Sequence, residues 1–304
     1  MESILLVGLL AATLRVATPL IFGTLGELFS ERSGVLNLGI EGTMFLGAFV
    51  GFVGAKLTGS LWLGFGMAIL AGMIAGLVMS LLTVRLGVNQ HVSGLGLTLL
   101  WTAVSLFGYR LIFGEPSVMP SMDTFPTVSP LAGVPFLGPI FEQRLLTYVA
   151  FALIPVVWWV IRRTRFGLKI RAVGENPEAA DASSLNVYQI RTQAQMIGGG
   201  LMAAGGAFLS EAMLGSMSFG IISGRGWVCI ALIIFANWEA VGVLWGALLF
   251  GCFFALQLAL QATGLKLPYE LLLTLPYVVT ILALAIAGRN VSAPSAMLKP
   301  YKRE

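Results

Sequence analysis

Polar side chains interrupt several apolar segments of the sequence, where an unpaired polar group is costly and is therefore a candidate for function. Asn37 and Glu41 stand four residues apart in SGVLNLGIEGTMFLG, and on a helix this spacing places both side chains on one face. A discontinuous helix with such residues is typical of a substrate site at the middle of a membrane. The alternative is that Glu41 bonds a neighbouring helix and never meets substrate. Four glycines around the pair permit close packing or a helix break: Gly34, Gly39, Gly42 and Gly47.

Two further polar groups occur at helical spacing. Residues 89–93 (NQHVS) open a later apolar segment, where they either line a pathway or cap the helix, and Ser93 is the expected cap. Gln257 and Gln261 are again four apart and share a face. The candidate pathway residues are Asn37, Glu41, Asn89, His91 and Gln257.

The sequence contains no motif for enzymatic chemistry. The P-loop pattern G-x-x-x-x-G-K-[ST] is absent, and no Ser stands in a G-x-S-x-G elbow. The sole histidine, His91, has no Cys or carboxylate at metal-ligand spacing. Cys229 and Cys252 lie in apolar segments, so we interpret them as packed thiols. We expect neither an enzyme nor a resident metal or cofactor.

The most strongly charged stretch runs from residue 162 to residue 187. Asn176 suits the N-cap and Pro177 the first position of a short helix, whose acidic residues complement the helix dipole. Such a helix outside a bilayer either docks a partner or belongs to a loop whose arginines only fix topology. Five of the 18 basic residues fall in the first ten positions: Arg162, Arg163, Arg165, Lys169 and Arg171.

The composition is that of an integral membrane protein. Apolar residues make up 57% of the 304 residues and charged residues 11%, against roughly 25% charged residues in soluble chains. Segments of about 20 apolar residues must be helical to satisfy their backbone groups in lipid. We predict an all-α polytopic bundle with a single transmembrane domain over residues 1–304. It has about nine spans (eight to ten): 4–28, 35–54, 61–84, 92–113, 145–161, 190–212, 226–237, 241–262 and 270–288.

Three of these segments are irregular. The second is interrupted by polar residues, and the seventh is short enough to be a broken or half helix. Pro276, followed by Tyr277, indicates a kink in the ninth. The outer connection 114–144 is rich in Pro and poor in charge, which favours turns and a short re-entrant or interfacial piece around 131–141.

The basic residues set the predicted orientation. If the loop 162–188 is cytoplasmic, twelve basic residues lie inside, against six outside, near the outer boundary or in the first span. Arg225 belongs to the second group. The N-terminus is then outside and the C-terminus cytoplasmic. The net charge of +4 is explained by loops and tail and does not indicate a nucleic-acid partner.

Five pieces of the sequence resemble one known family. The first is TPLIFGTLGELFSERSGVLNLGIEGTMFLGAF at 18–49, which resembles permease subunits of ABC importers for nucleosides and simple sugars, within the branched-chain amino acid and ribose permease group. The others are NQHVSGLGL at 89–97, RTRFGLKIRAVGENPEAAD at 163–181, GRGWVCIALIIFANW at 224–238 and LPYVVTIL at 275–282. The stretch from Gly167 to Pro177 is the most specific.

The resemblance implies that residues 162–188 contain the coupling helix, which sits in a groove of a separate ATP-hydrolysing subunit. Arg163, Arg165 and Arg171 would position this helix or meet acidic groups on the ATPase. The docking element would consist of Gly174, Glu175, Asn176, Pro177, Ala180 and Asp181.

The sequence departs from the family pattern at two places. Ser184 stands where the family commonly has Gly, and Ser pays a steric cost in a left-handed cap, so the helix is expected to end differently. Residues 236–240 (ANWEA) replace a G-x-W-x-P pattern, which leaves the turn between the seventh and eighth segments open.

The resemblance further implies an ATP-driven importer, with nucleosides as the expected substrate and simple sugars as the alternative. ATP and Mg²⁺ would bind the partner ATPase. A binding lipoprotein would deliver substrate at the outer face of a bacterial plasma membrane, and a related second permease would complete a heterodimer. An ion- or proton-coupled transporter using Glu41 and His91 is the competing hypothesis, and a channel or non-transporting scaffold is another. The near-absence of intramembrane Asp and Lys argues against the proton-coupled reading.

Overall fold

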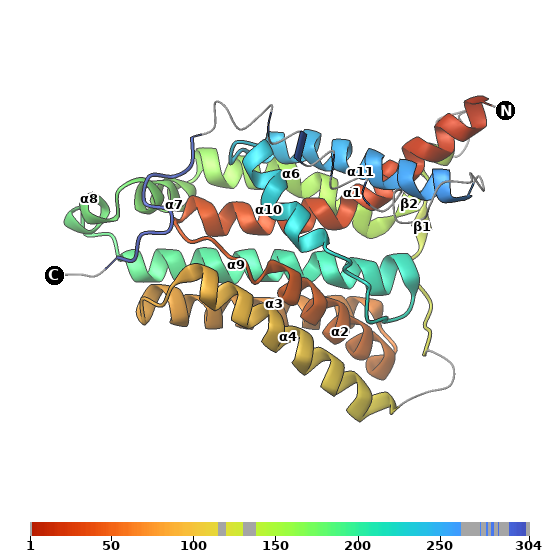
Figure 1. The fold of residues 1–304 in the computed structure, drawn as a ribbon, viewed down its shortest axis with the longest axis horizontal. Coiled ribbons are helices and arrows are strands. Elements are labelled where there is room, and N and C mark those ends of the chain that lie inside the picture. Colours follow the sequence, from red (N-terminus) through yellow and green to blue (C-terminus); the bar gives the residue numbers. More distant parts are fainter. Residues whose placement is uncertain are drawn as a thin grey trace.

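A computed structural model describes residues 2–114, 120–129, 138–262 and 292–301, with five single positions between 263 and 291. These residues form an elongated bundle of long helices (Figure 1). The start of α1 (Glu2–Arg32) and the segment 292–301 lie at opposite ends of it. The short helices α7 (Arg165–Glu175) and α8 (Pro177–Ala182) lie at the second of these ends, which we call the α8 end.

Seven further long or half-length helices complete the bundle, and two of the longer ones continue through a π-helical turn. They are α2 (Ile40–Thr58), α3 (Leu61–Ser80) with η1 (Leu81–Arg85), α4 (Gln90–Phe113), α6 (Leu145–Arg163), α9 (Val187–Ala207) with η2 (Phe208–Leu214), α10 (Arg225–Phe235) and α11 (Ala240–Ala262). Among the described residues, seven helices are long and apolar enough to cross a membrane. The predicted all-α membrane fold is confirmed.

Helix α9 lies at the centre and packs on α1, α2 and α3 with almost no side chains between the backbones. A side chain at Gly72 of α3 would collide with the Gly199 carbonyl of α9, and one at Gly206 would collide with the Met44 carbonyl of α2. Gly26 makes the corresponding close approach from α1. Small residues thus allow four helices to pack at backbone contact, as is usual in membrane bundles.

The structure shifts one of the irregular predicted spans and bears out another. The second helix begins at Ile40 and ends at Thr58, where residues 35–54 were expected, because the preceding residues are not helical. The seventh span is the eleven-residue helix α10, which agrees with the half helix considered for it. The ninth span, with Pro276, Tyr277 and the piece 275–282, lies outside the continuously described residues.

The described parts of the connection 114–144 pack against the end of the bundle opposite α8. They contain β1 (Thr127–Val128), α5 (Gly138–Phe141) and β2 (Gln143–Arg144), with Thr127 paired to Arg144 in antiparallel register. Phe125 is buried with its ring 5.1 Å from that of Trp62, at the start of α3. Of the re-entrant piece expected at 131–141, residues 131–137 lie outside the described part, and the rest forms one helical turn.

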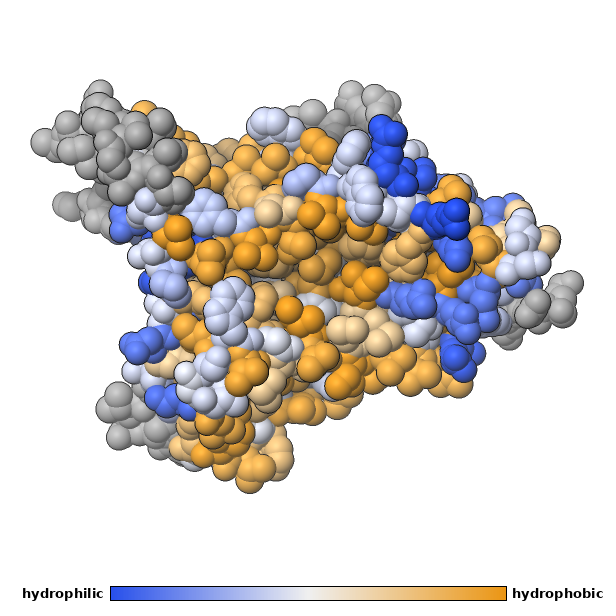
Figure 2. Space-filling view, turned by 180° about the vertical axis from the view of Figure 1, so that it is seen from behind, coloured by the Kyte–Doolittle hydropathy of each residue, from blue (hydrophilic) through white to orange (hydrophobic). Residues whose placement is uncertain are grey.

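One face of the molecule shows how this bundle meets a bilayer. Apolar side chains form a broad belt across the middle of the face in Figure 2, with polar side chains gathered toward both ends. Helix α4 contributes exposed apolar residues along its length, among them Leu99, Phe107 and Leu111. A helix that is apolar on its exposed side is stable against lipid or another apolar subunit.

Candidate functional site

A non-helical segment, residues 33–39, joins α1 to α2 inside the bundle. The Asn37 N–H donates to Glu27 Oε1 at 2.9 Å, more than one turn before the end of α1. Gly42 lies against Thr98 of α4, about 12 Å from the start of that helix at 1.5 Å per residue. Helix α2 therefore begins inside the bundle, beside α4.

Buried side chains from neighbouring helices satisfy the backbone of the segment 33–39. The bonds run from Arg191 Nε to the Ser33 carbonyl (3.0 Å), from Gln195 Nε2 to the Val35 carbonyl (3.4 Å) and from the Leu36 N–H to Gln90 Oε1 (2.8 Å). Because non-helical backbone at membrane depth must find its hydrogen bonds in protein, these side chains make the break possible. The segment is therefore held in place by α4 and α9.

Glu41 joins this first break to a second one. Its Oε1 accepts the Gly224 N–H at 2.8 Å and its Oε2 accepts the Gly226 N–H at 2.7 Å, at the start of α10. Helix α10 is about 16 Å long and follows the non-helical stretch 215–224. The carboxylate thus satisfies N–H groups that are otherwise left unpaired at a helix start, and it complements the helix dipole. Two discontinuous helices meet at Glu41.

The structure corrects how the predicted pathway residues are arranged. Asn37 and Glu41 do not share a helix face, because Asn37 precedes α2 and its Oδ1 accepts the Gly39 N–H at 2.9 Å. Asn89, not Ser93, caps α4, since its Oδ1 accepts the backbone N–H of the second residue of that helix at 2.9 Å. His91 is exposed at the start of α4, whereas Gln257 is buried in α11.

Arg225 lies at the second helix start. It begins α10 beside Glu41, half-buried, and its Nη1 donates to the Ile222 carbonyl at 2.9 Å. Its assignment outside or near the outer boundary of a membrane stays a prediction. The structure thus brings Asn37, Glu41 and Arg225 to one region and leaves Asn89 and His91 at the start of α4.

Helices α7 and α8 form the second candidate site, at the α8 end. Thr164 caps α7, with its Oγ1 accepting the Gly167 N–H at 3.1 Å. Asn176 caps α8, with its Oδ1 accepting the Ala179 N–H at 3.0 Å, and Pro177 occupies the first helical position. The short capped helix predicted from the sequence is present.

The nine predicted coupling residues divide by exposure. Arg163, Arg165, Glu175 and Asn176 are exposed, whereas Arg171, Pro177 and Asp181 are half-buried. Gly174 and Ala180 are buried and face the bundle. A side chain at Gly174 would collide with the Arg32 carbonyl at the end of α1, which explains a glycine there. The surface of α8 available to a partner therefore comes from its exposed positions.

The C-terminus of α8 corrects a second expectation. Ser184 adopts the left-handed conformation with φ of 64° although it is not glycine. Its N–H donates to the Asp181 carbonyl at 2.8 Å, and the Leu185 N–H donates to the Ala180 carbonyl at 3.1 Å. This pair of bonds is a Schellman motif, so the helix ends as a glycine-capped helix does. Ser184 therefore adopts the left-handed conformation in spite of its steric cost, and the geometry of the helix end is unchanged.

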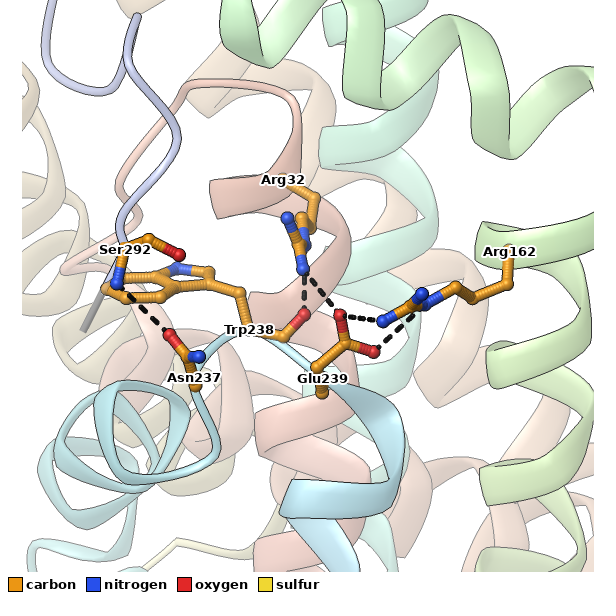
Figure 3. A network of polar contacts seen from close by, with 6 residues as sticks. All are labelled: Arg32, Arg162, Asn237, Trp238, Glu239 and Ser292. Atoms are coloured by element: carbon orange, nitrogen blue, oxygen red, sulfur yellow. Dashed lines mark hydrogen bonds and ion pairs between the residues drawn. The ribbon is translucent and has the colours of Figure 1, made fainter. Parts of the chain in front are cut away.

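A polar network connects the α8 end of α1 and α6 to the turn after α10 (Figure 3). Glu239 pairs with Arg32 of α1 at 3.0 Å and with Arg162 of α6 at 2.6 Å. Arg32 Nε also donates to the Trp238 carbonyl at 2.9 Å, and the Trp238 indole donates to Glu31. The turn 236–239, where the sequence departs from G-x-W-x-P, has positive φ at Asn237 (51°) and Trp238 (53°). The network holds this turn without the family proline.

Sequence reasoning missed several buried polar residues, some of which hold the first break. Glu27 and Glu31 are fully buried in the first span, four residues apart, and an acid pair in an apolar segment was the available signal. Glu211 is fully buried in η2, beside Gly51. π-Helical turns within helices are often found at functional sites. Arg191 and Gln195 gave no signal, because their targets are distant backbone groups.

Taken together, the fold and the sites define a polytopic membrane protein with two helices that begin inside the bundle and a capped helix pair at one end. Residues 9–284 match the family described as the permease component of the branched-chain amino acid transport system, and the chain belongs to this family.

Curated relatives match the chain over almost its whole length. A protein of Haloferax volcanii, provisionally named a glucose ABC transporter permease protein, is 40% identical over 98% of both chains. The guanosine ABC transporter permease protein of Bacillus subtilis is 36% identical over 95% of both, and the nucleoside ABC transporter permease protein of Lactococcus lactis is 35% identical over 95% of this chain and 94% of its own. No solved structure matches the chain. The chain is thus the membrane-spanning permease of an ABC importer.

Proposed function

We propose that this permease imports nucleosides. The supporting observation is its similarity, end to end, to the guanosine and nucleoside permeases of two bacteria. Simple sugars are the second candidate, favoured by the similarity to the Haloferax protein. The test is ATP-dependent uptake into vesicles that contain the complete transporter, measured with labelled nucleosides, pentoses and glucose. Uptake of sugars alone would contradict the nucleoside assignment.

We also propose that α8 is the coupling helix, docked in a groove of a separate ATPase subunit that binds ATP and Mg²⁺. A short helix with a capping side chain at one end and a Schellman motif at the other is rigid enough to transmit a displacement. Its exposed positions Glu178, Ala179 and Ser183 face away from the bundle. Arg163 and Arg165, just before and at the start of α7, are exposed and are proposed as partners for acidic groups on the ATPase.

The coupling assignment predicts the result of loosening α8. Pro177→Gly with Glu178→Gly removes the fixed first position and an N-terminal acid, so the ATPase should lose binding or substrate-stimulated hydrolysis. The matched control places two glycines in the exposed last turn of α4, as Arg110→Gly with Leu111→Gly. ATPase binding and stimulation at the wild-type level in the α8 variant would refute the assignment.

In the proposed orientation, the α8 end is cytoplasmic and the outer connection faces a substrate-binding lipoprotein. Arg32, Arg85 and Arg191 all lie toward the α8 end, in the arrangement that the positive-inside rule favours. A cysteine at the exposed position Ser183, in a background lacking Cys229 and Cys252, should label from the cytoplasmic side. Labelling from outside alone would invert the orientation.

The substrate pathway is proposed to run between this chain and a related second permease, past the paired helix starts at Asn37 and Glu41. Half helices that end inside a membrane bundle are a common construction at substrate sites. ATP binding in the partner subunits would shift the population between outward- and inward-open states. Gln257, buried in α11, is a further candidate on this route.

A further inference from the structure

The C-terminal segment, residues 292–301, lies across the α8 end of the bundle (Figure 1). It starts beside the turn after α10, where the Ser292 N–H donates to Asn237 Oδ1 at 3.2 Å (Figure 3). It finishes beside α9, where the rings of Tyr301 and Tyr188 are 5.7 Å apart. The segment therefore runs from the turn after α10 to the start of α9.

The middle of the segment is fixed to α7. The Ala296 N–H donates to the Gly174 carbonyl at 2.9 Å. The backbone N–H and Oγ of Ser295 donate to Glu175 Oε2 at 3.2 and 2.9 Å. Ala296 itself is only 3% exposed. Glu175, a predicted contact of the ATPase, is thus engaged by this chain's own C-terminal segment.

The same residues also contact the segment 33–39. A side chain on Gly34, which has φ of 89°, would lie 3.2 Å from the Ala296 carbonyl oxygen. Arg191 bonds both partners at once, with Nε on the Ser33 carbonyl at 3.0 Å and Nη1 on the Lys299 carbonyl at 3.4 Å. Ala296 therefore joins the C-terminal segment to α7 and to the first helix break, and Arg191 of α9 joins the same segment to the break.

We propose that residues 292–301 act as a strap that positions α7 and α8 relative to the segment 33–39. A displacement of α8 moves α7, and the strap passes the movement to the break at the start of α2. A loose C-terminal tail would need none of these bonds, and Ala296 would be exposed. This inference rests on the coupling role proposed for α8, and Ser295 and Ala296 are positioning residues within it.

The test compares one substitution at two positions of the strap. Ala296→Glu forces a carboxylate into a buried site and breaks the bond to Gly174, whereas Ala293→Glu adds the same side chain at an exposed site. In the complete transporter, Ala296→Glu should lower substrate-stimulated ATP hydrolysis and uptake about tenfold, the factor expected for one lost buried hydrogen bond. ATPase binding should be retained, and Ala293→Glu should match the wild type.

A second measurement covers the case in which Ala296→Glu fails to assemble. Cysteines at Glu175 and Ser295, in a background lacking Cys229 and Cys252, are joined by a short reducible cross-linker. Because the strap travels with α7, the cross-linked protein should transport at the rate of the reduced one. Arrest on cross-linking that a reductant relieves would overturn the proposal. So would equal activity of the two Glu variants.

These outcomes are separable from a failure of the coupling assignment itself. If the Pro177→Gly, Glu178→Gly variant uncouples while Ala296→Glu behaves as Ala293→Glu, then α8 couples and the strap does not. If the α8 variant keeps wild-type stimulation, the coupling assignment fails first.

Discussion

Removing the Glu41 carboxylate tests whether the two helix breaks depend on each other. Glu41→Gln keeps one acceptor oxygen, so it loses one of the bonds to the Gly224 and Gly226 N–H groups and the charge that faces the start of α10. A hydrogen bond to a charged group contributes about 1.5–3 kcal/mol, and a carboxylate at a helix start contributes about 0.3–1 kcal/mol. The expected loss is about 2–4 kcal/mol for Glu41→Gln. Glu41→Ala should lose more, because both N–H groups are left unpaired.

The assay has a stability arm and a transport arm. The midpoint temperature of thermal unfolding of the purified permease should fall by several degrees for Glu41→Gln and further for Glu41→Ala. If the contact forms in only one of the two transport states, a change of about 2 kcal/mol in that state shifts the population about thirtyfold, and uptake falls accordingly. Glu142→Gln, the same change at an exposed position, is the control. Wild-type stability and uptake in Glu41→Ala would refute the reasoning.

Two further predictions concern the α8 end. Ser184→Gly should stabilise the protein by about 1 kcal/mol, because a φ of 64° is sterically unfavourable for serine but not for glycine. The control Ser183→Gly, at a φ of −86°, should not raise the midpoint temperature of thermal unfolding. Glu239→Gln should destabilise by about 1–2 kcal/mol, mostly through Arg32, whose side chain is 16% exposed, since the Arg162 pair at 50% is largely screened by water. A double-mutant cycle with Arg162→Gln checks this division, and a coupling energy as large as that of the Arg32 pair would contradict it.

Local features of the fold could be predicted from the sequence because their causes are local. Asn176 followed by Pro177 marks a helix start whatever surrounds it, and α8 begins there. The apolar lengths likewise identify the spans, because lipid imposes the same requirement on every segment. The short seventh segment was recognisable as a half helix by its length alone.

The first helix break could not be predicted in detail because distant residues hold it. A four-residue spacing places Asn37 and Glu41 on one face only if the helix runs through both. Gln90 and Gln195 bond backbone groups of residues 33–39 in place of helical hydrogen bonds, and the periodicity of the sequence does not reveal these distant partners. The cap of α4 is a local feature, and the expectation of Ser93 was wrong because the helix begins earlier than a cap at Ser93 requires, at Gln90 after Asn89. The roles of the predicted site residues in transport stay predictions.

The backbone contacts of α9 limit which parts of the permease can move. Where a glycine meets a carbonyl directly, no side-chain rotamer can absorb a sliding motion, so we expect α1, α2, α3 and α9 to move as one body. Helix α4 buries only five residues, and the half-length α10 is held by Glu41 at one end and by the Figure 3 network at the other. Apolar substitutions should therefore be tolerated along the exposed side of α4 and almost nowhere along the inner face of α9. Measuring the tolerance of each position to substitution would therefore identify the helices that are packed rigidly against one another.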